Sequence, residues 1–108
     1  MKECTSKSPV NATLKVIGGK WKSLILWSLS KGTMRFGQLN REIAGVTQKM
    51  LTQQLRELEE DGLVVRTVYP EVPPRVEYSI SDYGKTLAPV LDSMAAWGNR
   101  HIERKAVK

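Results

Sequence analysis

The segment from Gln48 to Tyr69, QKMLTQQLRELEEDGLVVRTVY, most strongly constrains the fold of this chain. Its first part is amphipathic at helical spacing, and Gly62 ends the helical pattern. The residues of the apolar stripe are Leu51, Leu55 and Leu58. The β-branched and aromatic residues from Leu63 to Tyr69 predict a strand. With the helices predicted before and after it, this segment indicates a mainly α domain with a small β component (α+β).

The side of this helix opposite the leucines carries amides and cations. Lys49, Gln53 and Arg56 lie there, with Thr52 at the margin. A Gln can hydrogen-bond adenine through both amide atoms, an Arg can do the same to guanine, and a Thr methyl can contact the thymine methyl. The pattern therefore indicates a helix that lies in the major groove of DNA. A solvated helix face without a partner is the alternative.

The residues before this helix predict three shorter helices. We expect them at 9–17, 20–30 and 37–43, with an extended piece at 33–36. A pair of glycines separates the first two helices, and Thr47 is suited to cap the long helix. The helix at 20–30 is apolar on most sides, which is typical of a helix buried between two layers.

A β-hairpin and a long final helix follow. Strands are expected at 63–69 and 75–80, joined by the stiff loop PEVPP, which cannot continue either strand. Ser81 can cap a last helix at 82–104, and Pro89 inside that helix is expected to kink it.

This order of elements predicts a winged helix-turn-helix. The helix-turn-helix spans about 37–61 and the wing about 63–80. Arg66 and Arg75 flank the wing, where a guanidinium can contact phosphate or a narrow minor groove. Arg35 precedes the motif and is a further candidate for phosphate contact. An ordinary surface charge is the alternative for each arginine.

Charge and length agree with one domain that binds an anionic partner. The chain has 108 residues, a net charge of +6 and a pI near 9.7, with the cations concentrated toward both ends. Such a charge favours binding to double-stranded DNA or to a membrane surface, and Lys22 is a candidate for contact with the DNA backbone.

The longest apolar run, Leu24 to Trp27, is too short to span a membrane. A lone cysteine fits a reducing compartment, so we expect a cytoplasmic, nucleoid-associated protein.

The final helix predicts a subunit interface. An apolar stripe runs along it for four turns or more, longer than so small a domain can cover. Core packing is expected for Leu87 to Leu91, and a homodimer contact for Met94, Trp97, His101 and Ile102. A twofold dimer would place two recognition helices about 34 Å apart on a near-palindromic operator.

The chain resembles the HxlR-type winged-helix transcriptional regulators of bacteria. The matching segments are PVNATLKVIGGKWKSLILWSL, MRFGQLNREIAGVTQKMLTQQLRELEEDGLVVRTVYPEVPPRVEYSIS and YGKTLAPVLDSMAAWG, which cover nearly all of the chain. The resemblance implies a dimer formed by the helices at 9–17 and 82–104, which adds Leu14 to the interface. It also implies wing contacts from Tyr69 to Arg75. The recognition positions that it implies are Gln48, Lys49, Thr52, Gln53 and Arg56.

The chain departs from this family at a cysteine. Some members sense oxidants through a cysteine immediately before the proline of the PV motif, and here Ser8 stands at that position. The only thiol is Cys4, near Lys2 and Lys7, whose charges favour the thiolate. A redox sensor at Cys4 is therefore a hypothesis, and an inert thiol near the terminus is the alternative.

Other functional classes fit the sequence less well. No Ser/His/Asp set, Cys/His metal cluster or Gly-rich phosphate loop is present, so we expect neither an enzyme nor a metal or cofactor. A winged-helix module that binds only proteins would be expected to lack Lys49, Gln53 and Arg56. Membrane-surface binding is half supported by the basic residues after Trp97. A small-molecule effector would be expected between the winged domain and the dimer helices.

Overall fold

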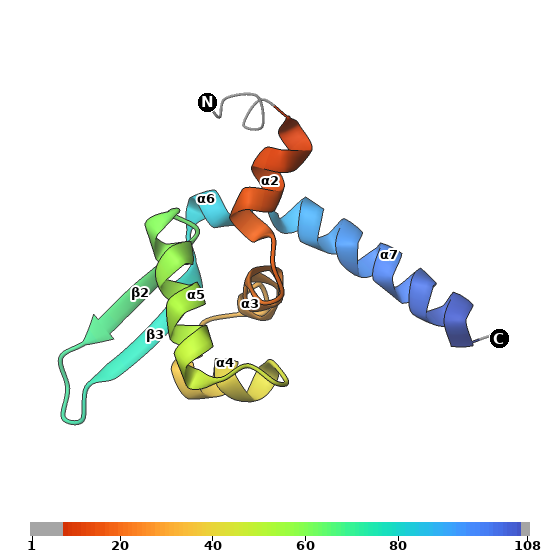
Figure 1. Cartoon of the computed structure of the whole chain (residues 1–108). Coiled ribbons are helices and arrows are strands. Elements are labelled where there is room, and N and C mark those ends of the chain that lie inside the picture. The colour runs from red at the N-terminus through yellow and green to blue at the C-terminus, as the bar shows by residue number, and fades with distance from the viewer. Residues whose placement is uncertain (1–7, 107–108) are drawn as a thin grey trace.

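The computed structural model describes residues 8–106, and its first half is mostly helical (Figure 1). The elements in chain order are α2 (Pro9–Ile17), α3 (Lys22–Leu29), β1 (Met34–Arg35), α4 (Phe36–Glu42), α5 (Gln48–Glu60), β2 (Val64–Tyr69), β3 (Arg75–Ile80), α6 (Asp82–Lys85) and α7 (Ala88–Ala106). The predicted fold class, mainly α with a small β component, is confirmed.

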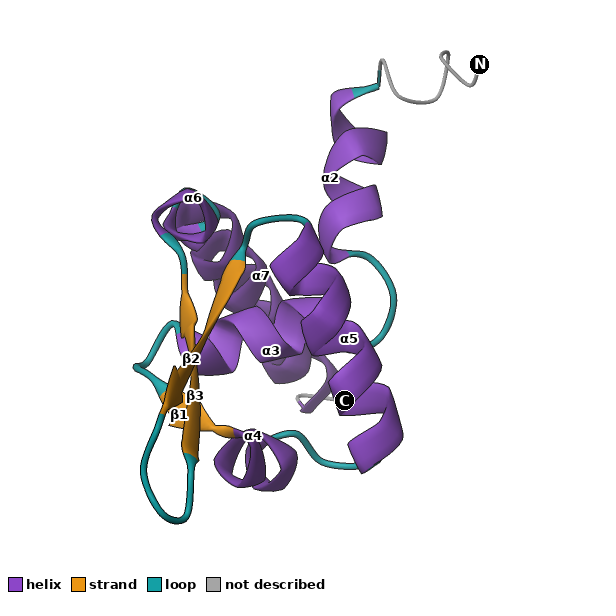
Figure 2. Ribbon diagram, turned by 90° about the vertical axis from the view of Figure 1, so that its left-hand side faces the viewer, coloured by secondary structure: helices purple, strands orange, loops and turns teal. Residues whose placement is uncertain are grey.

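Helix α3 lies at the centre of the domain. Ile25, Leu26 and Leu29 on this helix are buried and belong to the same core as the buried residues of α4, α5 and the sheet. Figure 2 shows α3, α4 and α5 on one side of the strands. The prediction that this helix is buried between two layers is confirmed, since its apolar residues on several sides have partners in the core.

The wing is part of a three-stranded antiparallel sheet rather than an isolated hairpin. The strand order is β1-β3-β2, and Met34 and Arg35 of β1 pair with Tyr78 and Glu77 of β3. The extended piece expected at 33–36 therefore supplies a third strand. Two-stranded hairpins are marginally stable alone, so β1 and the helices anchor the base of the wing.

The predicted helix boundaries around α5 are confirmed by its caps. The Thr47 hydroxyl accepts a hydrogen bond from the Met50 amide at 3.1 Å, which satisfies one free N–H of the first turn. At the other end Gly62 adopts a φ of +77°, a conformation that favours glycine. The chain can therefore turn from α5 into β2 within a few residues.

The prediction of one kinked final helix is wrong. The structure has two helices, α6 and α7, separated at residues 86–87. Ser81 caps α6 as expected, accepting from the Gly84 amide at 2.9 Å. Pro89 lies in the first turn of α7, where a missing N–H leaves no helical hydrogen bond unmade. The proline is thus compatible with the start of a helix and does not kink it.

Helix α7 extends away from the rest of the domain (Figure 1). Leu91 is buried near its beginning, whereas most of its later residues are exposed. Within residues 8–106, none of the helices combines the length and the apolarity needed to cross a bilayer.

We predict that Gly84→Ala destabilises the fold, because a Cβ there would meet the Leu63 carbonyl oxygen and lie 2.7 Å from Ile80 Cγ2. Overpacking of this kind costs about 1–3 kcal/mol, measured as the free energy of unfolding in urea. Gly37→Ala is the control, since its nearest neighbour is the end of the Arg41 side chain at 3.6 Å. Equal stability of the two variants would contradict the prediction.

Candidate nucleic-acid interface

One face of α5 is covered by the core and the opposite face is exposed. Its three leucines, Leu51, Leu55 and Leu58, are at most 1% exposed. All five predicted recognition residues are exposed; they are Gln48, Lys49, Thr52, Gln53 and Arg56. The helix therefore presents hydrogen-bonding and cationic groups outward from a rigid apolar layer. Their contact with DNA stays a prediction.

The exposed Thr52 side chain is fixed by its own helix. Its hydroxyl donates to the Gln48 carbonyl oxygen at 2.8 Å, one turn earlier. This back-bond occupies the hydroxyl proton and restricts the side-chain rotamer. The methyl group is then the part of Thr52 best suited to meet a thymine methyl.

Glu57 links the outward face of α5 to α3. Its Oε2 accepts from Gln53 Nε2 at 2.8 Å, and its Oε1 lies 2.7 Å from Lys22 Nζ. The Lys22 side chain is only 12% exposed. The Lys22 ammonium therefore already has a carboxylate partner within the protein, and its expected contact with the DNA backbone stays a prediction.

These neighbours change the acidity of Glu57. Hydrogen bonds from Lys22 and Gln53, together with the positive charge of Lys22, lower the pKa of the Glu57 carboxyl below its ordinary value of 4.5. The carboxylate is therefore ionised at neutral pH and accepts from both partners. Sequence reasoning missed Glu57, although its position four residues after Gln53 is the spacing at which helical side chains meet.

Arg75 and Tyr69 form a cluster at the base of the wing loop. The Arg75 guanidinium lies 4.0 Å above the centroid of the Tyr69 ring and within 3.2 Å and 3.3 Å of Glu71 and Glu77. A stacked guanidinium between two carboxylates is well suited to hold two strand ends together. Arg75 therefore has structural partners that a phosphate would have to replace or share.

Arg35 and Arg66 are both exposed but do not form one patch. Arg35 pairs with Glu77 in the sheet, and Arg66 pairs with Tyr78. Glu77 and Tyr78 are consecutive and point to opposite faces, and paired residues share a face. The two arginines therefore project from opposite faces of the sheet.

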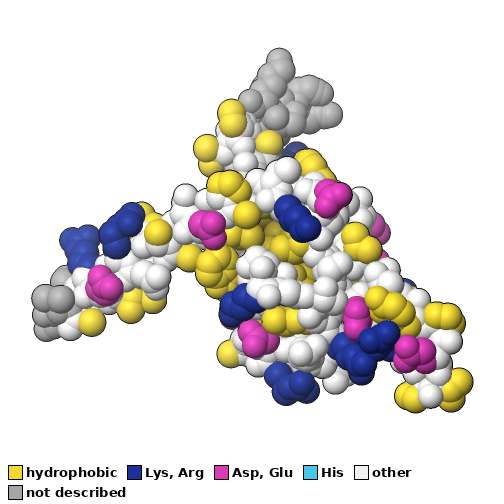
Figure 3. All heavy atoms as spheres, turned by 180° about the vertical axis from the view of Figure 1, so that it is seen from behind, with side chains coloured by type: hydrophobic (Ala, Val, Ile, Leu, Met, Phe, Trp, Pro, Cys, Tyr) yellow, Lys and Arg dark blue, Asp and Glu magenta, His cyan; other side chains and the backbone are white. Residues whose placement is uncertain are grey.

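The predicted dimer residues are exposed on the two terminal helices. Leu14 on α2 is 56% exposed, and Met94, Trp97 and Ile102 on α7 are 46%, 60% and 66% exposed. His101 stacks on Trp97 with ring centroids 5.0 Å apart. Figure 3 shows hydrophobic side chains along the projecting helix α7. Val90 is also exposed, contrary to the core packing expected from Leu87 to Leu91.

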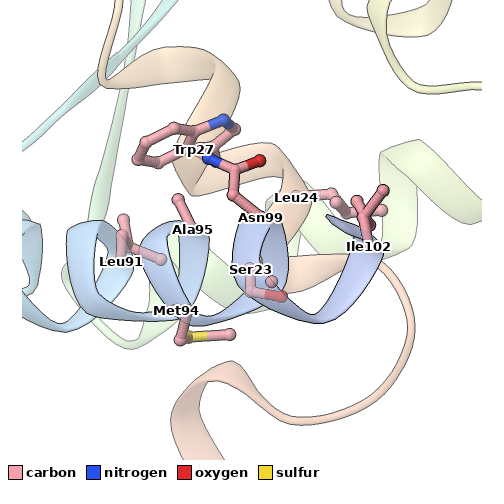
Figure 4. A pocket seen from close by; sticks show the side chains of 9 residues that line it. Ser23, Leu24, Trp27, Leu91, Met94, Ala95, Asn99 and Ile102 are labelled. Carbon is pink, nitrogen blue, oxygen red and sulfur yellow. The ribbon is translucent and has the colours of Figure 1, made fainter. Parts of the chain in front are cut away.

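A cleft of about 380 Å³ separates α3 from α7 (Figure 4). Trp27 and Leu24 line it from α3, and Met94 and Ile102 line it from α7. Ser23 and Asn99 supply polar groups. The cleft lies where an effector was expected, and it shares two residues with the predicted dimer surface.

The proposed redox residue Cys4 lies outside the described residues. The Ser8 hydroxyl, at the position of the cysteine in some family members, accepts from the Asn11 amide at 3.3 Å and caps α2. Among residues 8–106, no group of three or more His, Cys, Asp or Glu side chains is placed to hold a metal ion.

A model of the HxlR-like helix-turn-helix family matches residues 16–106. The chain belongs to this family. The uncharacterised HTH-type transcriptional regulator YtcD of Bacillus subtilis (strain 168) is 57% identical over 95 residues, which cover 88% of this chain and 75% of that protein. The relatives are transcriptional regulators, so the family supports DNA binding.

Solved structures of related regulators have the same fold. The YtcD crystal structure matches with a TM-score of 0.84 and 56% identity, covering 89% of this chain and 98% of that one. The redox regulator HypR in its reduced form matches with a TM-score of 0.86 and 46% identity, covering 94% of this chain and 100% of that one. The predicted family and winged helix-turn-helix fold are therefore confirmed.

We predict that Glu57→Gln lowers stability at neutral pH and that the difference from the wild type disappears in acid. A carboxyl whose pKa is lowered by folding stabilises the protein above its unfolded value, here 4.5, and this contribution is lost as pH falls through the folded pKa. Urea midpoints measured from pH 7 to acid pH check this. A difference that persisted unchanged below pH 4.5 down to pH 2 would contradict it.

Proposed function

We propose that this protein is a sequence-specific transcriptional regulator that binds a near-palindromic operator as a homodimer. The observation that carries the proposal is the α5 face of exposed amides and cations above three buried leucines. Membership of a family whose relatives are HTH-type transcriptional regulators supports the same function.

In this proposal α5 enters the major groove and reads base edges. Gln53 and Arg56 supply the paired hydrogen-bonding groups that suit adenine and guanine, and Thr52 supplies a methyl for thymine. Gln48 and Lys49 lie in the first turn, where the helix dipole and the ammonium both favour a phosphate. Phosphate contacts supply most of the affinity, and α5 supplies the choice of sequence.

The wing contributes beside the recognition helix. The exposed Arg66 is better placed for a phosphate than Arg75, because Arg75 already contacts Tyr69, Glu71 and Glu77. Arg35 is the N-cap residue of α4 and can contact the DNA backbone next to the first helix of the motif.

The homodimer is proposed from the exposed apolar residues of α2 and α7. A monomer rarely leaves a large apolar surface in water, and a twofold axis lets one surface pair with its copy. The residues of this proposed interface are Leu14, Met94, Trp97, His101 and Ile102.

A small-molecule effector in the α3–α7 cleft would contact Met94 and Ile102 and so reach the dimer interface. The redox response of Cys4 stays a prediction.

We predict that Arg56→Ala costs about 1–3 kcal/mol of binding to the selected operator and relaxes preference at one base pair in each half-site. Binding to a panel of single-base operator variants measures this loss. Arg100→Ala on α7 is the control, because it removes the same charge from an exposed position away from α5. Equal weakening of every sequence by Arg56→Ala would contradict base reading.

We predict that the wild type has twice the 12.2 kDa mass of one chain at micromolar concentration, and that Trp97→Asp shifts it toward one chain. A charge within an apolar interface is costly unless it is paired. Light scattering measures the mass. Val72→Asp is the control, since Val72 is fully exposed at the wing tip. A wild-type mass of 12.2 kDa would contradict the dimer.

A further inference from the structure

The hydrogen bond to Glu57 determines how Gln53 presents its amide. A carboxylate only accepts, so the amide nitrogen of Gln53 faces Glu57 Oε2, at 2.8 Å. One of the two amide protons is used in this bond. The second proton and the carbonyl oxygen remain, and these are the donor and acceptor that pair with adenine N7 and N6.

Lys22 holds the carboxylate in turn. Its ammonium lies 2.7 Å from Oε1, so each Glu57 oxygen has its own partner. The Lys22 side chain is 12% exposed and that of Glu57 is 37% exposed, so the lysine side of this ion pair is shielded from solvent. Lys22 belongs to α3, the central helix of the core, so the arrangement connects the core to the outward face of α5.

We infer that Glu57 is a specificity-determining positioning residue, held by Lys22, that fixes the Gln53 amide in the orientation required to read adenine. This inference rests on the proposed function. Glu57 itself need not touch a base. Its negative charge lies beside the DNA-binding face and opposes phosphate binding, which makes a direct contribution to affinity unfavourable. Glu57 instead orders the Gln53 side chain before DNA binds. It also excludes the flipped orientation of the Gln53 amide, in which the nitrogen and the oxygen exchange places.

The test is selection of binding sites from a pool of random duplexes by the full chain. The wild type is expected to select a half-site that has adenine at one particular position. Gln53→Ala is expected to lose the preference for adenine at that position. Glu57→Ala is expected to reduce that preference about two- to tenfold, the range that corresponds to ordering one side chain. Lys22→Met is expected to reduce the same preference by a smaller factor, since Glu57 then loses one of its two partners.

Two comparisons separate positioning from a general effect of charge or stability. Glu60→Ala removes an exposed carboxylate from the same helix and is expected to change affinity for all sequences alike. In the double variant Gln53→Ala with Glu57→Ala, the second change is expected to cause no further loss of adenine preference. Thermal melts of each variant verify folding, and the preference is a ratio between sequences that partial unfolding does not alter.

The possible results distinguish this inference from the proposed function. Adenine preference in Glu57→Ala equal to that in Glu60→Ala would overturn the positioning role and leave the proposed function intact. A further loss in the double variant would also overturn it, because Glu57 would then act independently of Gln53. A wild type that selects no sequence would overturn the proposed function and this inference together.

Discussion

The contact between the leucine layer of α5 and the central helix α3 is the interaction on which the rest of the structure depends. Leu51, Leu55 and Leu58 are buried together with Ile25 and Leu26 of α3. Since these side chains fix the rotation of α5 about its axis, they also fix which residues face outward. A register change in this layer would bury the amides and cations and expose the leucines.

Several polar side chains near the proposed DNA surface already have partners within the protein. Gln53 is bonded to Glu57, Thr52 to its own helix, and Arg75 to Tyr69 and two carboxylates. Side chains that are ordered beforehand lose less conformational freedom on binding, which favours specificity. The same contacts lower the number of free cations, so the remaining exposed ones, Arg66 and Lys49 among them, carry more of the proposed phosphate binding.

Much of the fold could be predicted because its signals are local. The spacing of leucines in α5, the caps Thr47 and Ser81, and Gly62 each act within a few residues, and the structure has all of them. The sequence pattern predicts one final helix with Pro89 in its interior, whereas the structure has two helices and places Pro89 in the first turn of the second. The sequence alone does not distinguish a proline that kinks a helix from one that begins the next.

Several contacts that sequence reasoning missed depend on how the elements pack or pair, whether their residues are far apart or close in the chain. The ion pair of Lys22 with Glu57 joins two different helices, so the sequence pattern of either helix alone does not indicate it. The stacking of Arg75 on Tyr69 depends on the hairpin register, and its phosphate contact stays a prediction. Likewise, the strand role of Met34 and Arg35 depends on pairing with β3. Periodicity identifies which face of an element is polar, whereas tertiary contacts decide which polar groups remain available.

Hydroxyl-radical footprinting of the protein on its selected duplex tests the central claim most directly. Two recognition helices related by a twofold axis predict two protected segments, about one DNA turn or roughly 34 Å apart, on the same face of the duplex and symmetric about its centre. One protected segment, or protection spread evenly along any duplex, would contradict a dimer that reads an operator through α5.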